Sequence, residues 1–334
     1  MNTRERVLAS LRHQQPDKVP YSIGFTQVAH ANMVDYYGDP DFTQKLGNCF
    51  AAHSMQPAEM WREVRPDIWE DGFGVQWDRS VDKDIGCVCN CLVTPENVDD
   101  FPMPDPADPR RWERLPQIIE DNPEKFIITD LGFSLFERAW TLAGMENILM
   151  GMMANPDFVH RLLDRILEYN LKVIEIACTY KNDVMMFGDD WGTQRGVMMG
   201  VDLWREFIGP RVKQMYQAAK SKGRFVFIHS CGKVDELFDE LIGYGLDTFN
   251  PFQPEVMEPA EMKHLYGDRL CFFGGVSTQR LLPLGTPHET REEVKRLLDV
   301  VGKNGGYFAS PAHATPADAK PENIAAMIEV LQNQ

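Results

Sequence analysis

Beyond residue 120, short apolar runs alternate along the chain with longer segments in which apolar positions recur at helical spacing. The apolar runs have the length of buried strands, and they occupy residues 126–129, 183–188, 224–229, 246–249, 270–274 and 306–309. The longer segments predict helices over residues 155–180, 204–220, 234–242, 289–301 and 321–331. Strands that alternate with helices of this length indicate βαβ units and a parallel sheet.

The strand count and the chain length favour an α/β protein built as a single (β/α)8 TIM barrel with an N-terminal extension. A doubly wound open sheet is the second choice, because no glycine-rich phosphate-binding sequence follows any of the strands. There is no internal repeat and no obvious linker. We therefore expect one domain over residues 1–334, with N-terminal elements and the first strands in 1–120 and the remaining βα units in 121–334.

Charge and composition narrow the classes of partner. The formal net charge of −16 is opposite to that of most nucleic-acid-binding proteins, so we expect no nucleic-acid partner. No apolar run approaches the roughly 20 residues that cross a bilayer, and residues 1–20 lack the apolar stretch of a signal peptide. We therefore expect a cytoplasmic protein without membrane contact. The odd number of cysteines, seven, favours burial or metal binding over disulfides.

Polar side chains follow the predicted strands, at the end where a barrel carries its chemistry. In chain order these candidates are Asp189, Asp190, Trp191, Gln194, His229, Cys231, Asn250, Gln253 and His313. The paired acids, Asp189 and Asp190, suit a general base, a metal ligand or a substrate hydrogen-bond acceptor. The alternative is that they cap a helix and lie in its first turn.

His229 and Cys231 are the pair of residues in the sequence that best suits metal binding. In an extended chain, residues i and i+2 lie on the same side, roughly 6.6 Å apart. Imidazole nitrogen and thiolate sulfur suit Zn²⁺, and His313, after the last strand, is the best third ligand. The alternative is a hydrogen-bonded buried histidine beside an unrelated cysteine.

A second cysteine pattern, Cys87, Cys89 and Cys91, has a period of two. Iron–sulfur sites use loops that wrap around a cluster, which this spacing does not provide. We therefore expect a strand with small buried side chains there.

Five segments, in order over nearly the whole chain, resemble the uroporphyrinogen decarboxylase superfamily. They read TRERVLASLRHQQPDKVP, GDDWGTQRGVMMGVDLWREFIGPRVKQMYQAAKSKG, FIHSCGKV, FFGGVSTQRLLPLGTPHE and GGYFASPAHATPADAKPENI. The resemblance implies a (β/α)8 barrel, in agreement with the pattern of strands and helices.

The superfamily has two chemical branches, and the resemblance is greater to the second. Metal-free decarboxylases carry an arginine near the N-terminus that binds substrate carboxylates, whereas residues 19–38 here contain no arginine. Cobamide-dependent methyltransferases bind zinc through His-x-Cys and a later cysteine. His229 and Cys231 match the first part of that motif, and His313 stands where the later cysteine is expected. The resemblance thus implies zinc, and a corrinoid (cobalamin) carried on a separate partner protein.

Replacing one thiolate by a neutral histidine leaves more positive charge on the metal, which favours a substrate bound through oxygen. We therefore expect a demethylase for a small methyl donor such as a methyl ether or a methoxylated aromatic, or the reverse transfer onto a small acceptor. Zinc would polarise the leaving oxygen while a reduced corrinoid attacks the methyl group. Asp189 or Asp190 would position the substrate or supply a proton, and we expect substrate contacts from Trp191, Gln194, Asn250 and Gln253. A metal-independent decarboxylase and a non-catalytic binding protein are the alternatives.

Overall fold

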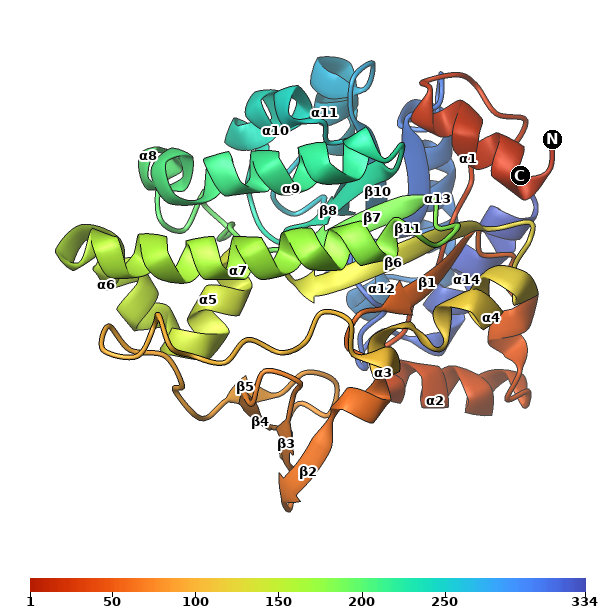
Figure 1. Ribbon diagram of the computed structural model, residues 1–334. Coiled ribbons are helices and arrows are strands. Elements are labelled where there is room, and N and C mark those ends of the chain that lie inside the picture. Colours follow the sequence, from red (N-terminus) through yellow and green to blue (C-terminus); the bar gives the residue numbers. More distant parts are fainter. The chain divides into compact units, whose positions relative to one another are not determined.

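The computed structural model describes residues 1–334 and contains two sheets (Figure 1). The larger sheet has seven strands in the order β1 (Phe50–Ser54), β6 (Phe126–Phe133), β7 (Val184–Gly188), β8 (Phe225–His229), β9 (Thr248–Phe252), β10 (Cys271–Val276) and β11 (Tyr307–Pro311). The smaller sheet has the order β2 (Arg62–Arg65), β3 (Ile68–Glu70), β4 (Gln76–Asp78) and β5 (Cys87–Val88). The chain divides into two compact units, each drawn from separate stretches of sequence.

One unit comprises residues 52–123 and 127–246. Its parallel strands β6, β7 and β8 are paired so that Phe133 lies beside Gly188 and Gly188 beside His229. The long helices α7 (Pro156–Ala177) and α9 (Gly209–Ser221) pack against each other, and α9 also contacts β8 (Figure 1). The other helices of this unit are α3 (Pro109–Trp112), α4 (Leu115–Asp121), α5 (Phe136–Ala143), α6 (Met145–Ala154), α8 (Val201–Leu203) and α10 (Phe238–Tyr244).

The other unit comprises residues 1–51, 124–126 and 247–334. Its parallel strands β9, β10 and β11 lie side by side, and α13 (Pro287–Val300) packs against α14 (Pro321–Gln332). Thr286 caps α13, because its side chain accepts from the Glu289 N–H while the Glu289 carboxylate accepts from the Thr286 N–H. The remaining helices are α1 (Thr3–Leu11), α2 (Gln27–Tyr37), α11 (Pro259–Tyr266) and α12 (Leu281–Leu284).

A short extended segment, residues 20–25, hydrogen-bonds on both of its sides within this second unit. The Ser22 N–H donates to the carbonyl of Ala309 in β11 at 3.1 Å. The Cys49 N–H, immediately before β1, donates to the carbonyl of Tyr21 at 2.9 Å. The segment therefore bridges β11 and the start of β1 without forming a regular strand.

The parallel α/β architecture expected from the sequence is confirmed, and each predicted strand and helix is present with ends displaced by a few residues. Two helices begin irregularly: a π-helical turn at Trp204–Ile208 precedes α9, and a 3-10 turn at Asp235–Leu237 precedes α10. The eight-stranded barrel, the N-terminal extension and the single domain stay predictions. No helix combines the length and the apolar character needed to cross a membrane.

The burial expected for the three closely spaced cysteines is wrong, and the strand expected there is present only as the short β5. Cys87, Cys89 and Cys91 are exposed, and β5 contains only two residues. The physical reason is position, because β5 is an edge strand of the small sheet and its side chains are not covered by another layer. The small sheet itself was not among the predicted elements, although the Pro66–Asp67 pair between β2 and β3 is a typical turn sequence.

Candidate metal centre

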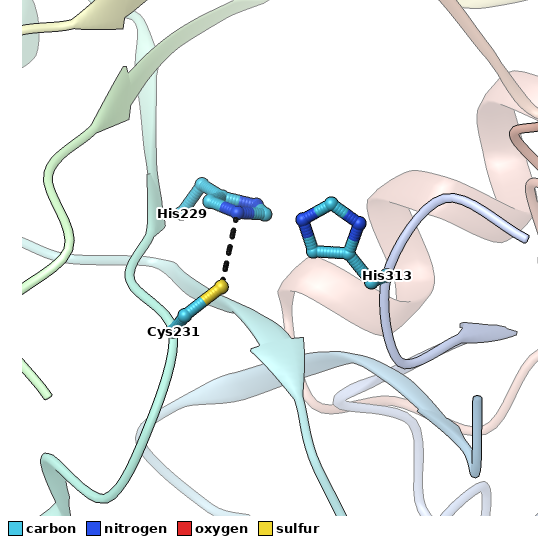
Figure 2. Close-up of side chains that lie close together, drawn as sticks. All are labelled: His229, Cys231 and His313. Carbon is cyan, nitrogen blue, oxygen red and sulfur yellow. Dashed lines mark hydrogen bonds between the residues drawn. The ribbon is translucent and has the colours of Figure 1, made fainter. Parts of the chain in front are cut away.

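The predicted pair, His229 and Cys231, is positioned by the end of β8. His229 is the last residue of the strand, and the Cys231 sulfur lies 3.5 Å from His229 Nε2 (Figure 2). A tetrahedral zinc ion with a nitrogen at about 2.05 Å and a sulfur at about 2.3 Å holds those two atoms about 3.6 Å apart. The two side chains therefore already have the separation that zinc requires.

The backbone around Cys231 is held by the loop that follows β7. The Cys231 N–H donates to Asp190 Oδ1 at 2.7 Å, and the Lys233 N–H donates to the Thr193 carbonyl at 2.8 Å. The loops approach so closely that a Cβ at Gly192 would clash with the Cys231 carbonyl oxygen. A glycine is thus required at 192 for Cys231 to occupy this position.

The third predicted ligand, His313, lies close to this pair. His313 follows β11, and its side chain is exposed. One ligand atom each from His229, Cys231 and His313 lies within 4.8 Å of the other two, and the three side chains point toward one another in Figure 2. Two imidazoles and one thiol form a donor set that suits Zn²⁺.

Asp189 holds neighbouring elements of the chain together through hydrogen bonds. It is fully buried, and its carboxylate accepts from the N–H groups of Leu135 (3.3 Å) and Glu137 (2.8 Å) at the start of α5, and from Trp191 Nε1 (2.6 Å). Burial raises its pKa to about 6, while these hydrogen bonds act in the opposite direction. This geometry supports the helix-capping alternative, with the difference that the capped helix precedes Asp189 in the chain.

Asp190 is the acid closer to the candidate ligands. It is half-buried, and it accepts the hydrogen bond from the Cys231 N–H described above. The pKa of the Cys231 thiol is raised, first by burial and then by the negative charge of Asp190. Asp190 therefore fixes the thiol's backbone and adds negative charge beside the site.

Glu137 is a buried acid that is absent from the residues predicted by the sequence. Burial, followed by the charges of Asp190 and Asp189, raises its pKa well above the ordinary value. Its only sequence signal is an acid at the second position of the helix that follows a strand, which is common in helices that bind nothing.

The four predicted substrate contacts have different environments. Trp191 is fully buried, and its ring lies edge-on to Trp204. Gln194 is exposed. Asn250 and Gln253 are both buried, and Asn250 Nδ2 donates to the Phe273 carbonyl at 3.0 Å. Substrate contact by these residues stays a prediction.

Two curated relatives differ in how much of the chain they match. A uroporphyrinogen decarboxylase of Chlorobium phaeovibrioides is 24% identical over 227 residues, which is 61% of this chain and 59% of that protein. This chain thus spans about three fifths of the length of the curated decarboxylase it matches. The methylcobamide:CoM methyltransferase MtaA of Methanosarcina barkeri is 22% identical over 343 aligned positions, covering 97% of this chain and 96% of that protein.

Similarity also extends to a solved structure and to a family model. A methyltransferase structure from Methanosarcina mazei superposes with a TM-score of 0.75 at 17% identity, covering 100% of this chain and 99% of that one, so the two share a fold. The family model described as "Uroporphyrinogen decarboxylase (URO-D)" matches residues 88–334. Because this match covers most of the chain, the protein belongs to the uroporphyrinogen decarboxylase family.

Proposed function

We propose that this protein is a zinc-dependent methyltransferase that moves a methyl group between a small substrate and a separate corrinoid protein. The observation that carries the proposal is the convergence of His229, Cys231 and His313, whose ligand atoms lie within 4.8 Å of one another. Similarity over 97% of the chain to a protein named methylcobamide:CoM methyltransferase supports the same reaction class.

The three residues would hold zinc, which when bound supplies a Lewis acid for an electronegative atom of the substrate. Two neutral imidazoles and one thiolate leave more positive charge at such a site than a set with two thiolates. A harder site favours an oxygen ligand over a sulfur ligand. A methyl ether, including a methoxylated aromatic, is therefore the substrate class that this donor set suits best, and its loss of a methyl group would make the protein a demethylase.

The acids near the candidate ligands have separate tasks in this proposal. Asp189, fully buried, positions α5 and the indole of Trp191, so it acts through other groups. Asp190, half-buried, holds the backbone of Cys231 and is the acid with surface available to a substrate. We therefore assign substrate positioning to Asp190 and a supporting role to Asp189.

The eight-stranded barrel, the partner protein and the cellular location are part of the same proposal. An eight-stranded barrel is supported by residues 20–25, which hydrogen-bond to Ala309 and to Cys49 as an eighth strand would. The corrinoid would be carried by a partner protein in the cytoplasm, and the small methyl donor or acceptor would be the second reactant.

A methyl-transfer assay tests the proposal. The zinc-loaded protein is mixed with a reduced corrinoid protein and a panel of methyl ethers, and methylcorrinoid is followed by absorbance. We expect transfer from at least one ether, a loss of at least about tenfold in Cys231→Ser through weakened metal binding, and no change in Cys87→Ser, whose cysteine is exposed. Equal transfer by metal-free protein, or release of carbon dioxide from uroporphyrinogen without metal, would contradict the proposal.

A further inference from the structure

An aromatic pocket of about 180 Å³ lies within the unit that carries His229 and Cys231. Its walls come from the end of β6, from the small antiparallel sheet and from the segment after β1, and they include Gln56, Trp61, Trp77, Arg79, Leu131 and Phe133. A dry cavity of about 150 Å³ is large enough to bind benzene. The pocket therefore has room for one aromatic ring.

The aromatic side chains of the pocket are arranged for ring contact. The rings of Trp77 and Phe133 are stacked with centroids 5.4 Å apart, and Trp61 meets Trp77 edge-on at 6.1 Å. The guanidinium carbon of Arg79 lies 4.2 Å from the centre of the Trp61 ring, so the planar guanidinium group covers that ring. Such surfaces favour a planar aromatic ring over an aliphatic ring of equal size.

Two polar atoms of the pocket residues lack partners. The indole N–H of Trp77 and the side-chain oxygen of Gln56 are both buried without a hydrogen bond, and Trp77 is only 2% exposed. Leaving a buried donor or acceptor unpaired is costly, so each of these two groups calls for a partner outside the chain, such as water or a ligand. A hydroxyl group on the ring could accept from the Trp77 N–H or donate to the Gln56 oxygen.

Strand register relates the pocket to the candidate metal ligands. Phe133 pairs with Gly188, and Gly188 pairs with His229, so two strand spacings separate Phe133 from His229. At about 4.8 Å per strand, the two backbones lie about 10 Å apart. Gly132 also lines the pocket, and the space beside it is open, because a Cβ there would meet nothing within 4 Å. A ring in the pocket and a ring substituent directed toward His229 fit this distance.

We propose that this pocket binds the ring of a single-ring aromatic methyl ether, with the ether oxygen directed toward the His229–Cys231 pair. The inference rests on the proposed function for the identity of the reaction. Binding of the ring depends on the residues of the pocket and not on the metal, so it can be measured without metal and without methyl transfer.

The test measures dissociation constants by isothermal titration calorimetry on metal-free protein. The probes are 2-methoxyphenol and methoxybenzene, with methoxycyclohexane as the non-aromatic match. We expect the aromatic ethers to bind at least fivefold more tightly than methoxycyclohexane. Trp61→Leu should weaken aromatic binding about three- to tenfold, as expected for the loss of one ring contact. Tyr36→Leu is the control for loss of an aromatic side chain, because Tyr36 is exposed on α2 and does not line the pocket.

Equal affinity for aromatic and aliphatic ethers, or equal losses in Trp61→Leu and Tyr36→Leu, would overturn the pocket assignment. Circular dichroism spectra of both variants exclude unfolding as the cause of a loss. Failure of the proposed function has a different signature: aromatic ethers would bind and Trp61→Leu would weaken them, but the metal-loaded protein would transfer no methyl group.

Discussion

Cys231 owes its position to backbone contacts more than to contacts of its sulfur. Its N–H is bound by Asp190, and the next residue, Gly232, has a φ of +87°, a conformation that favours glycine. Asp190 also places negative charge near the thiol. A divalent cation bound at this point would offset the charge of this carboxylate and of a thiolate.

At the residue scale, buried His53 is expected to make the free energy of unfolding depend on pH. It is buried, its Nε2 lies 2.6 Å from the Arg111 carbonyl oxygen, and burial lowers its pKa. The unfolded chain therefore binds a proton at His53 more readily than the folded chain does. The contribution of neutral His53 to the free energy of unfolding is present above pH about 6.5, and it is lost as the pH falls below that value. We expect wild type to lose more free energy of unfolding than His53→Gln between pH 7.5 and 5.0, measured by urea denaturation. Equal losses in the two proteins would contradict this assignment.

Individual residues show what the sequence can and cannot predict about the site. His229, Cys231 and His313 could be proposed as ligands because each lies at or just after the end of a recognisable strand, and because their side chains are of types that bind metals. The capping role of Asp189 was not predictable in detail, because its partners at Leu135 and Glu137 lie more than 50 positions earlier. Glu137 was missed because its burial depends on that same long-range contact.

At the scale of elements, the small sheet is fastened to α5 by a buried ion pair. Asp71 Oδ2 lies 3.0 Å from Arg138 Nη1, and both side chains are 1% exposed. Asp71 also accepts from the N–H groups of Phe73 and Val75, and the guanidinium carbon of Arg138 lies 3.9 Å above the Phe73 ring. This pair stabilises the turn that shapes one side of the aromatic pocket.

Removing the charge of Asp71 should destabilise the protein strongly. Asp71→Asn leaves Arg138 buried without a counter-charge, and breaking such a pair costs about 3–5 kcal/mol of unfolding free energy. Asp67→Asn is the matched control, because the Asp67–Lys83 pair at 2.9 Å is about half exposed, and such pairs contribute under about 1 kcal/mol. Urea denaturation measures both. A loss for Asp71→Asn no larger than that for Asp67→Asn would show that the buried pair has no such role.

The elements of the parallel sheet were easier to predict than the small sheet. Runs such as Val226, Phe227 and Ile228 are apolar at consecutive positions because both faces of β8 are covered. Strands β2 to β5 have two to four residues each, and most of their side chains are exposed or half-buried. Such short strands carry too little periodicity to be recognised, which is also why the exposure of Cys87 and Cys89 was missed.

At the scale of the whole molecule, similarity to other proteins leaves two reactions open. The relatives of this chain include proteins named as decarboxylases and proteins named as methyltransferases, so the comparisons alone do not choose between the two reactions. The choice depends on the convergence of His229, Cys231 and His313, and on the absence of arginine from residues 19–38. Metal content therefore separates the two reactions more directly than any comparison.

The most direct measurement is the zinc content of the purified protein by elemental analysis, with wild type, His313→Ala and His264→Ala treated alike. His264 is exposed on α11 and is the control for loss of a histidine. We expect about one zinc per chain in wild type and in His264→Ala, and a zinc affinity at least about tenfold weaker in His313→Ala, measured by competition with a chelator. Wild-type protein without zinc, or His313→Ala with unchanged zinc content and affinity, would contradict the three-ligand site.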